Sequence, residues 1–298
     1  MVVLSAVVGI PFFGTQVYAR GLAHVPQLTI TPAAERDVLN TDFRGTDGLE
    51  PVSGGTVFAA LAEAPWRDGP DVLLLHTCEA DCPDGQAREQ EIGTLPEGAH
   101  LSSWAVSADG DRLLAGAVLS TGELAVYRCS DEDCDGPWVT ELPSSGLPLY
   151  GLRLAPGPHG GYAALLHGPP PPAIRPSDDM PAALLTCSSL DCETPSVSRL
   201  PDIMEPDLAL APDGSIAIAH LTQDSSALHL LVCAGDGCDA TDSRELDGAW
   251  RPEAPRFGGD RPGPSVAIGP DGRPHVAGVG RDGERLLYHA CADAHCSS

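Results

Sequence analysis

The stretch "PDLALAPDGSIAIAHLTQDSSALHLLVC", residues 206–233, decides the fold. It contains three short, mainly apolar runs, separated by the polar turns "PDG" and "TQDSS". A PDG sequence suits a type I turn followed by a left-handed glycine, which joins two antiparallel strands. We therefore predict three antiparallel strands, the last of which ends at Cys233.

The same pattern recurs along the chain. The last copy reads "PSVAIGPDGRPHVAGVGRDGERLLYHAC" (264–291) and the second "LSSWAVSADGDRLLAGAVLSTGELAVYRC" (101–129). Each copy ends at the first member of a close cysteine pair, and these first cysteines are 46 to 58 residues apart. A repeat of this length indicates a propeller or another repeat array. The five pairs are Cys78/Cys82, Cys129/Cys134, Cys187/Cys192, Cys233/Cys238 and Cys291/Cys296.

A fourth strand is predicted after each of the first four pairs, at "REQEIGTL", "WVTELP", "SVSRLP" and "SRELD". No helical period occurs after residue 20. Four strands per repeat predict an all-β fold, a β-propeller of five four-stranded blades. The predicted single domain covers 20–298, with blades at 45–98, 99–146, 147–203, 204–248 and 260–298. The turns that join the first two strands are expected at Gly55, Gly110, Gly160, Gly214 and Gly272.

The first strand of each repeat has a large face and a small face, because side chains alternate along a strand. Such sheets can stack in a ring, large face into small face. The large residues are Leu49, Trp104, Val106, Leu152, Leu154, Leu208, Leu210, Val266 and Ile268. The small ones are Ala105, Ala155, Ala209, Ala211, Ala267 and Gly269.

The fifth repeat has only three predicted strands before Cys296, which would leave an exposed sheet edge. Residues 25–33, "VPQLTITPA", form an extended run in which Leu28 and Ile30 alternate with polar residues. We expect this run to pair as the outer strand of the fifth blade and to close the ring.

The "PDG-x-P-x-V-A" pattern resembles the repeats of bacterial extracytoplasmic β-propellers, a loose group that includes sialidase-like and NHL-like repeats. The resemblance spans residues 25–298. The sialidase aspartate box (Ser/Thr-x-Asp-x-Gly-x-Thr-Trp) is absent, so the resemblance implies the fold and not an activity.

The chain carries a formal net charge of −25, from 42 acidic residues and 17 arginines, with no lysine. Such a surface repels nucleic-acid backbones and anionic lipid headgroups, which excludes both as expected partners. We expect a monomer whose partner is a glycan, a peptide or another envelope protein.

Residues 2–19, "VVLSAVVGIPFFGTQVYA", are uncharged. They have the length of a short membrane span, and "VYA" at 17–19 resembles a signal-peptide cleavage site. Either interpretation, a membrane anchor or a cleaved signal, puts the rest of the chain outside the cytoplasm. The remaining alternative is a buried N-terminal helix or strand. The stretch lacks a basic leader, so the natural start is expected upstream.

The cysteine pairs admit two interpretations, disulfides or metal ligands. A structural zinc site needs four converging ligands, whereas each pair here lies on a different repeat. The even count and the export-like N-terminus favour five local disulfides. The acids enclosed by the pairs lack the spacing of a calcium loop, so no metal is expected.

The innermost strands of a propeller line its central channel, where a ligand can bind. By register, Ser103, Asp207 and Ser265 belong to one ring of equivalent positions, together with Gly48 and Gly151. Glu50 and Arg153 follow on the same face. We predict Asp207, Arg153, Glu50, Ser103 and Ser265 as candidate ligand-binding residues; the alternative is tight packing around an axis.

The sequence contains no dinucleotide, phosphate-loop, metalloprotease or nucleophile-elbow motif, so no cofactor is expected. The leading interpretation is a non-catalytic exported binding protein. The alternative is a sialidase-like glycan hydrolase, for which only Tyr150 and Arg153 would qualify. His76, His220, His275 and His289 are interpreted as blade-packing residues.

One loop departs from the repeat. Residues 167–183, "HGPPPPAIRPSDDMPAA", replace a short turn of the third repeat, and four prolines make the loop semi-rigid. The loop is either a tolerated insertion or a docking or gating element. Replacing residues 168–182 by a short turn should leave folding intact.

Peptide mapping under non-reducing conditions should find only disulfides within pairs, including Cys78–Cys82, and no free thiol. The reason is that two cysteines flanking a short turn are already within disulfide reach. A crosslink between two repeats, or zinc bound to reduced thiols, would contradict this prediction.

Overall fold

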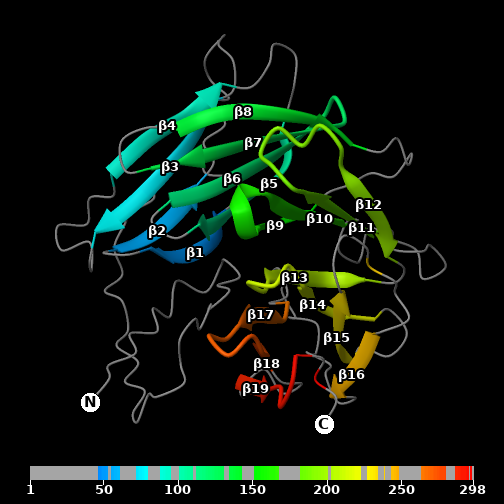
Figure 1. Ribbon diagram of the computed structural model, residues 1–298. Coiled ribbons are helices and arrows are strands. Elements are labelled where there is room, and N and C mark those ends of the chain that lie inside the picture. The colour runs from blue at the N-terminus through cyan, green and yellow to red at the C-terminus, as the bar shows by residue number, and fades with distance from the viewer. Residues whose placement is uncertain are drawn as a thin grey trace, which may run out of the picture. The chain divides into compact units, whose positions relative to one another are not determined.

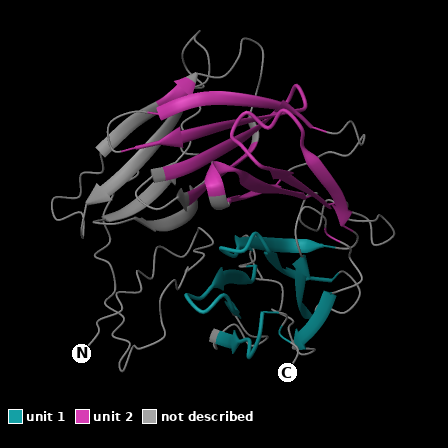
Figure 2. Ribbon diagram, in the orientation of Figure 1, with its two compact units in different colours: residues 1–37, 203–235, 239–298 teal, residues 38–202, 236–238 magenta. Residues whose placement is uncertain are grey.

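A computed structural model describes most of the repeat region of the chain (Figure 1). The described residues are 46–52, 55–60, 72–79, 88–94, 101–109, 112–130, 134–142, 151–167, 182–200, 203–222, 227–233, 238, 243–247, 263–279, 286–294 and 296. The chain divides into two compact units (Figure 2). We call them the 38–202 unit, which also includes 236–238, and the 203–298 unit, which also includes 1–37.

The 38–202 unit contains three four-stranded antiparallel sheets, whose strands follow one another in chain order: β1–β4, β5–β8 and β9–β12. The strand β5 lies beside both β1 and β9, so neighbouring sheets meet along their first strands. The strands are β1 (Thr46–Val52), β2 (Gly55–Ala60), β3 (Val72–Glu79), β4 (Arg88–Thr94), β5 (Leu101–Asp109), β6 (Arg112–Leu119), β7 (Glu123–Cys129), β8 (Cys134–Glu141), β9 (Gly151–Pro156), β10 (Tyr162–His167), β11 (Ala182–Cys187) and β12 (Ser196–Leu200).

The 203–298 unit contains a four-stranded sheet, β13–β16, and a sheet with three described strands, β17–β19. Here β13 lies beside β17. The strands are β13 (Met204–Leu210), β14 (Ile216–Leu221), β15 (Leu228–Cys233), β16 (Ser243–Asp247), β17 (Ser265–Ile268), β18 (Pro274–Val279) and β19 (Leu286–Ala290).

The chain is nearly all-β, and its four-stranded antiparallel sheets are consistent with a propeller. A short 3-10 turn, Pro158–Gly160, joins β9 to β10. The four predicted outer strands are confirmed as β4, β8, β12 and β16, although β8 begins earlier, at Cys134. The predicted closing strand, residues 25–33, and the stretch 2–19 lie outside the described residues. No helix in the described part of the chain is long and apolar enough to cross a membrane.

The predicted turn chemistry is confirmed in the 203–298 unit. Gly214 and Gly272 have φ of 87° and 76°, in the left-handed region that glycine adopts without strain. Their amides donate hydrogen bonds to the carbonyl oxygens of Ala211 and Gly269, both at 2.9 Å. In the first turn the carboxylate of Asp213 also accepts a hydrogen bond from the Ser215 amide, at 2.9 Å. This is how "PDG" reverses the chain.

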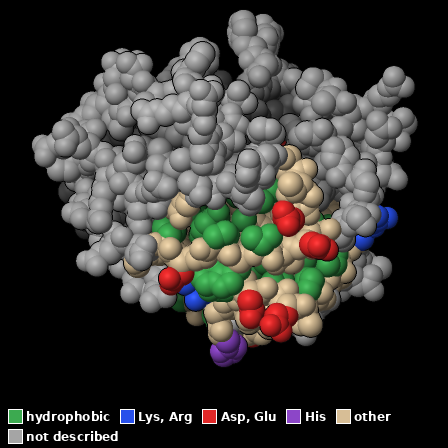
Figure 3. Space-filling view, turned by 90° about the horizontal axis from the view of Figure 1, so that it is seen from above, with side chains coloured by type: hydrophobic (Ala, Val, Ile, Leu, Met, Phe, Trp, Pro, Cys, Tyr) green, Lys and Arg blue, Asp and Glu red, His purple; other side chains and the backbone are tan. Residues whose placement is uncertain are grey.

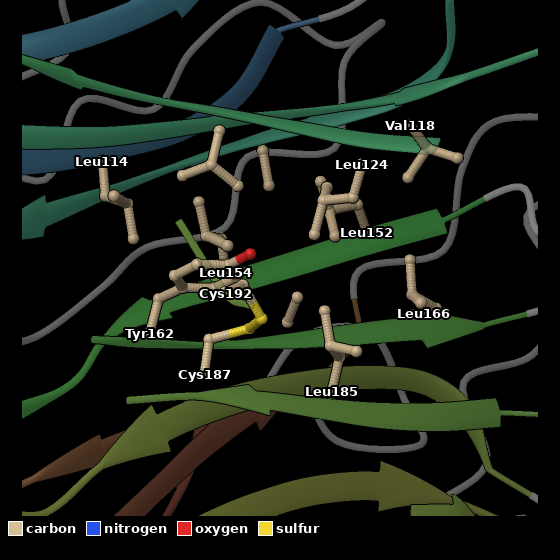
Figure 4. Packing of buried hydrophobic residues seen from close by; sticks show 13 residues of the cluster. Leu114, Val118, Leu124, Leu152, Leu154, Tyr162, Leu166, Leu185, Cys187 and Cys192 are labelled. Atoms are coloured by element: carbon tan, nitrogen blue, oxygen red, sulfur yellow. A yellow bond between two sulfur atoms is a disulfide. The ribbon is translucent and has the colours of Figure 1, made fainter. Parts of the chain in front are cut away.

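Between the sheets β5–β8 and β9–β12 the large-into-small rule holds for the first strands only, because the face with Ala105 also carries buried large residues on β6 and β7: Leu114, Val118, Leu124 and Val126. Leu152 and Leu154, on the large face of β9, share one buried cluster with Ala105, on the small face of β5 (Figure 4). A Cβ on Gly116 of β6 would lie 3.2 Å from the Cδ2 atoms of both leucines. A side chain at Gly116 would therefore occupy space that the leucines fill.

The opposite face of the sheet β5–β8 packs on β4 of the first sheet. Val106 and Tyr127 lie in a second buried cluster. Trp104 of β5 and Ile92 of β4 pack against this cluster. A Cβ on Gly93 of β4 would lie 3.0 Å from the Tyr127 ring. Here too a large residue meets a position without a side chain. The large and small faces of the first strand do not continue across the sheet, because Ala115, Ala117 and Ala125 lie on the face of Val106.

The disulfides lie where the third strands end. Cys129–Cys134, Cys187–Cys192 and Cys291–Cys296 are bonded within their pairs, as predicted, and Cys233 and Cys238 are also disulfide-bonded. None of the cysteines in the described ranges is free. Cys82 lies outside the described residues, so the first pair stays a prediction. The four disulfides indicate an oxidising environment.

The three disulfides whose geometry is described differ in their setting, and one of them joins residues that face each other across paired strands. Cys129 and Cys134 are register partners on β7 and β8. Cys192 and Cys296 instead have φ of 44° and 54°, and their amides donate to the carbonyl oxygens of Ser189 and Asp293. These two pairs therefore close a tight turn after the third strand.

Replacing Leu152 by alanine should lower the free energy of unfolding by about 2–5 kcal/mol, because the fully buried side chain would leave a cavity between two sheets. The exposed Val197 of β12 provides the control, and Val197→Ala should change stability by less than about 0.5 kcal/mol. Chemical denaturation measures both. Equal effects of the two substitutions would contradict the packing described above.

Candidate functional site

The predicted channel residues lie on first strands, as the register requires. Glu50, Ser103 and Arg153 lie on β1, β5 and β9 of the 38–202 unit. Asp207 and Ser265 lie on β13 and β17 of the 203–298 unit. The structure does not describe the side chain of Glu50.

Asp207 is a carboxylate buried within the fold, with an exposed fraction of 2%. The backbone N–H of Val266 donates to its Oδ2 at 2.8 Å. The bond joins β13 to β17, the first strands of two neighbouring sheets. Asp207 therefore links the two sheets through a buried hydrogen bond.

The other described candidates, Arg153, Ser265 and Ser103, are also partly or fully buried. Arg153 is half-buried, and its Nη1 donates to the carbonyl oxygen of Leu152 at 3.1 Å. Ser265 is 9% exposed, and Ser103 is half-buried. The structure therefore brings Asp207 close to β17, but assigns none of these side chains to a ligand.

Sequence reasoning missed His167, at the end of β10. It pairs with Gly151 of β9, and a Cβ on Gly151 would overlap the His167 imidazole. The glycine in the predicted ring of channel positions is thus explained by a histidine stacked over it. The signal was available in the pairing of the two strands, because Gly151 and His167 are opposite each other. The proline-rich residues 168–181 that follow lie outside the described residues.

A polar network crosses the sheet β13–β16. His220 of β14 is 3% exposed, and its Nδ1 lies 3.3 Å from the Leu221 carbonyl oxygen. A carbonyl only accepts, so Nδ1 carries the proton and Nε2 accepts from the Ser243 hydroxyl at 3.2 Å. The ring of His229 stacks on His220 with centroids 5.5 Å apart.

Burial lowers the pKa of His220 to about 4, an effect to which neighbouring His229 adds, while the hydrogen bond to Leu221 opposes it. Burial also lowers the pKa of His229, against the raising effect of Glu245. His220 is therefore neutral at physiological pH. The predicted blade-packing role is confirmed for His220, which supports the sheet rather than a reaction.

A second cluster lies at the turn end of the sheet β17–β19. We call it the Tyr288 cluster: Gly269, Asp271, Arg273, His275 and Tyr288. The Tyr288 hydroxyl lies 2.5 Å from His275 Nδ1, and the two rings stack with centroids 5.9 Å apart. Tyr288 is 52% exposed, whereas His275 is half-buried. His275 stacks on the neighbouring strand, and its predicted role in packing between blades stays a prediction.

The acidic composition is visible on the described surface. Acidic side chains are spread among apolar ones on the face in Figure 3, and basic side chains lie at its margin. Nowhere in the described ranges do three or more His, Cys, Asp or Glu side chains converge as metal ligands. Eight of the described cysteines are disulfide-bonded, so their sulfur atoms are not thiolates that could bind zinc.

No protein-family model and no curated protein matches the chain. Solved structures are similar to it over most of its length. The α-L-arabinofuranosidase of Fusarium graminearum is 13% identical, over 82% of this chain and 74% of that one, with a TM-score of 0.46. AofleA of Arthrobotrys oligospora is 13% identical, over 88% and 71%, with a TM-score of 0.47. The α-L-arabinanase of Penicillium chrysogenum is 11% identical, over 79% and 71%, with a TM-score of 0.44.

Acid should destabilise the protein through His220. Its pKa falls from 6.5 to about 4 on folding, so the unfolded state binds the proton first. The full contribution of neutral His220 to the free energy of unfolding is present above pH 6.5. It is lost as the pH falls toward 4, and the total loss is about 3 kcal/mol. Denaturant titrations at pH 7.5 and pH 5 should show a smaller loss for His220→Gln, which keeps a polar side chain without titrating. An identical loss in both proteins would contradict this assignment.

Proposed function

We propose that this chain is an exported, non-catalytic β-propeller that binds a ligand or a protein partner at the cell envelope. The observation that supports it most is the state of Asp207. The one acidic side chain predicted in the central channel and described by the structure is 2% exposed and bonded to the Val266 amide. A carboxylate so engaged serves the fold, and is not positioned as an acid, a base or a nucleophile.

The proposal includes a closed ring. Five sheets recur with the same strand order, and four of them have a fourth, outer strand. We propose that residues 25–33 supply this strand beside β19, which gives five four-stranded blades. The alternation of Leu28 and Ile30 with polar residues suits such a half-exposed strand.

Export is proposed from two features. Four disulfides indicate an oxidising environment. The uncharged stretch 2–19 has the character of a signal peptide or a membrane anchor. Both features suit a protein that works outside the cytoplasm, with a glycan, a peptide or an envelope protein as its partner.

Glycan hydrolysis is the second candidate. Two of the similar structures carry the names arabinofuranosidase and arabinanase, which puts arabinosides beside sialosides as substrates to test. In this chain Tyr150 and Arg153 would have to be the catalytic residues of such a hydrolase. Arg153 donates to the Leu152 carbonyl oxygen, a contact within its own strand.

A glycan array and a panel of fluorogenic glycosides separate the two candidates. We expect the full-length protein to be retained by array glycans or by envelope proteins, and to release no fluorophore from arabinofuranosides or sialosides. Release of fluorophore that is lost in Tyr150→Phe and Arg153→Ala would overturn the binding proposal in favour of the hydrolase.

A further inference from the structure

We propose that the outer edge of the sheets β5–β8 and β9–β12 binds a basic segment of a partner protein through three apolar residues: Trp138, Leu190 and Val197. We call these residues the Trp138 strip. This deepens the proposed function, on which it rests, by naming a partner class and a surface. Both sheets belong to the 38–202 unit, so the strip lies within one compact unit.

The strip lies on the two faces that enclose one buried cluster, the cluster between the two sheets (Figure 4). Trp138 of β8 is opposite Val126 of β7. Val197 of β12 is opposite Leu185 of β11. Because opposite residues of antiparallel strands lie on the same face, both side chains share a face with a member of the cluster. Leu190, in the disulfide-closed turn after β11, packs directly on the cluster.

All three residues remain accessible at the edge of this cluster. Val197 has an exposed fraction of 43%, and Trp138 and Leu190 are half-buried. The indole of Trp138 lies against Gly136, where a Cβ would be 3.3 Å from its Cε3 atom. A ring held by its surroundings has little freedom left to lose, which lowers the entropic cost of binding a partner.

The repeat shows that the fold does not require apolar residues at these positions. Trp138 pairs with the residue three positions before the first cysteine of its repeat, and Val197 with the residue two positions before. The residues equivalent to Trp138 on the other outer strands are polar: Gln90, Ser198 and Arg244. Those equivalent to Val197 are also polar: Glu89 and Ser243. Leu190 is the only large apolar residue among those that the five cysteine pairs enclose. The strip is therefore particular to these two sheets.

Negative charge surrounds the strip. In β8, in β12 and in the segment between β11 and β12, four exposed side chains are acidic and one is basic: Asp135, Glu141, Asp191, Glu193 and Arg199. The whole chain carries a net charge of −25 and has no lysine. Such a surface attracts cationic partners and repels anionic ones.

The combination of apolar residues and acids selects one kind of partner. A protein segment that carries lysine or arginine beside leucine, phenylalanine or tryptophan can cover the strip and pair with the acids around it. A neutral glycan would leave these acids without a positive charge. The structure thus favours a basic, apolar protein segment over a glycan at this surface.

A displayed library of random 12-residue peptides tests the proposal with the full-length protein. Selection should enrich peptides that combine lysine or arginine with leucine, phenylalanine or tryptophan. Fluorescence anisotropy then measures the affinity of an enriched peptide. Trp138→Gln should weaken its binding about tenfold or more, because a tryptophan at the centre of an interface is often an anchor. Val197→Ser should weaken binding about threefold or more, through the apolar contact it removes.

Val139→Ser is the matched control. Val139 has the same exposed fraction as Val197, 43%, but it is opposite Ala125 and so lies on the other face of β8. Only Val197→Ser should reduce binding. Equal effects of the two serine variants, enrichment of peptides without positive charge, or no enrichment at all would overturn the surface.

Melting temperature is the second readout. Both serine variants should melt like the parent protein, because the two valines are exposed. If Trp138→Gln melts clearly lower, the two serine variants still decide the outcome. Retention by array glycans without enrichment of basic peptides would show that the surface fails and the binding function stands. Glycoside turnover by the parent protein would instead contradict the proposed function.

Discussion

The structure depends on one contact, in which two leucines of a first strand pack on an alanine and a glycine of the neighbouring sheet. Between β5–β8 and β9–β12, Leu152 and Leu154 pack on Ala105 and Gly116. Burying a leucine stabilises a fold by about 1.5–3 kcal/mol. A second large residue at Gly116 would force the sheets apart. The contact therefore fixes both the order of the sheets and the distance between them.

The remaining features support this contact. Asp207 adds a buried hydrogen bond between the first strands β13 and β17. The disulfides described by the structure tie the ends of β7, β11 and β19 to the turn or strand that follows. A short loop closed by a disulfide contributes on the order of 2 kcal/mol. In a chain with only 5% aromatic residues, several such contributions matter beside a core of alanine, leucine and valine.

Much of this architecture could be predicted from the sequence, because its causes are local. The left-handed glycines of the "PDG" turns, the four outer strands and the pairing of nearby cysteines depend on residues close in the chain. The role of Asp207 could not be predicted, since its partner is a backbone amide 59 residues away on another sheet. The pairing of Tyr288 with His275 was missed for a similar reason: the two residues are diagonal neighbours across β18 and β19, and only the strand register brings them together.

A double-mutant cycle on Gly116 and Leu154 tests the central contact most directly. Gly116→Ala and Leu154→Ala should each lower the free energy of unfolding, the first by crowding and the second by leaving a cavity. If the two side chains compete for one space, the double variant should be less destabilised than the two costs together, by about 0.5–3 kcal/mol. Costs that add to within about 0.3–0.5 kcal/mol would show that the two positions do not share a contact, and would contradict the account.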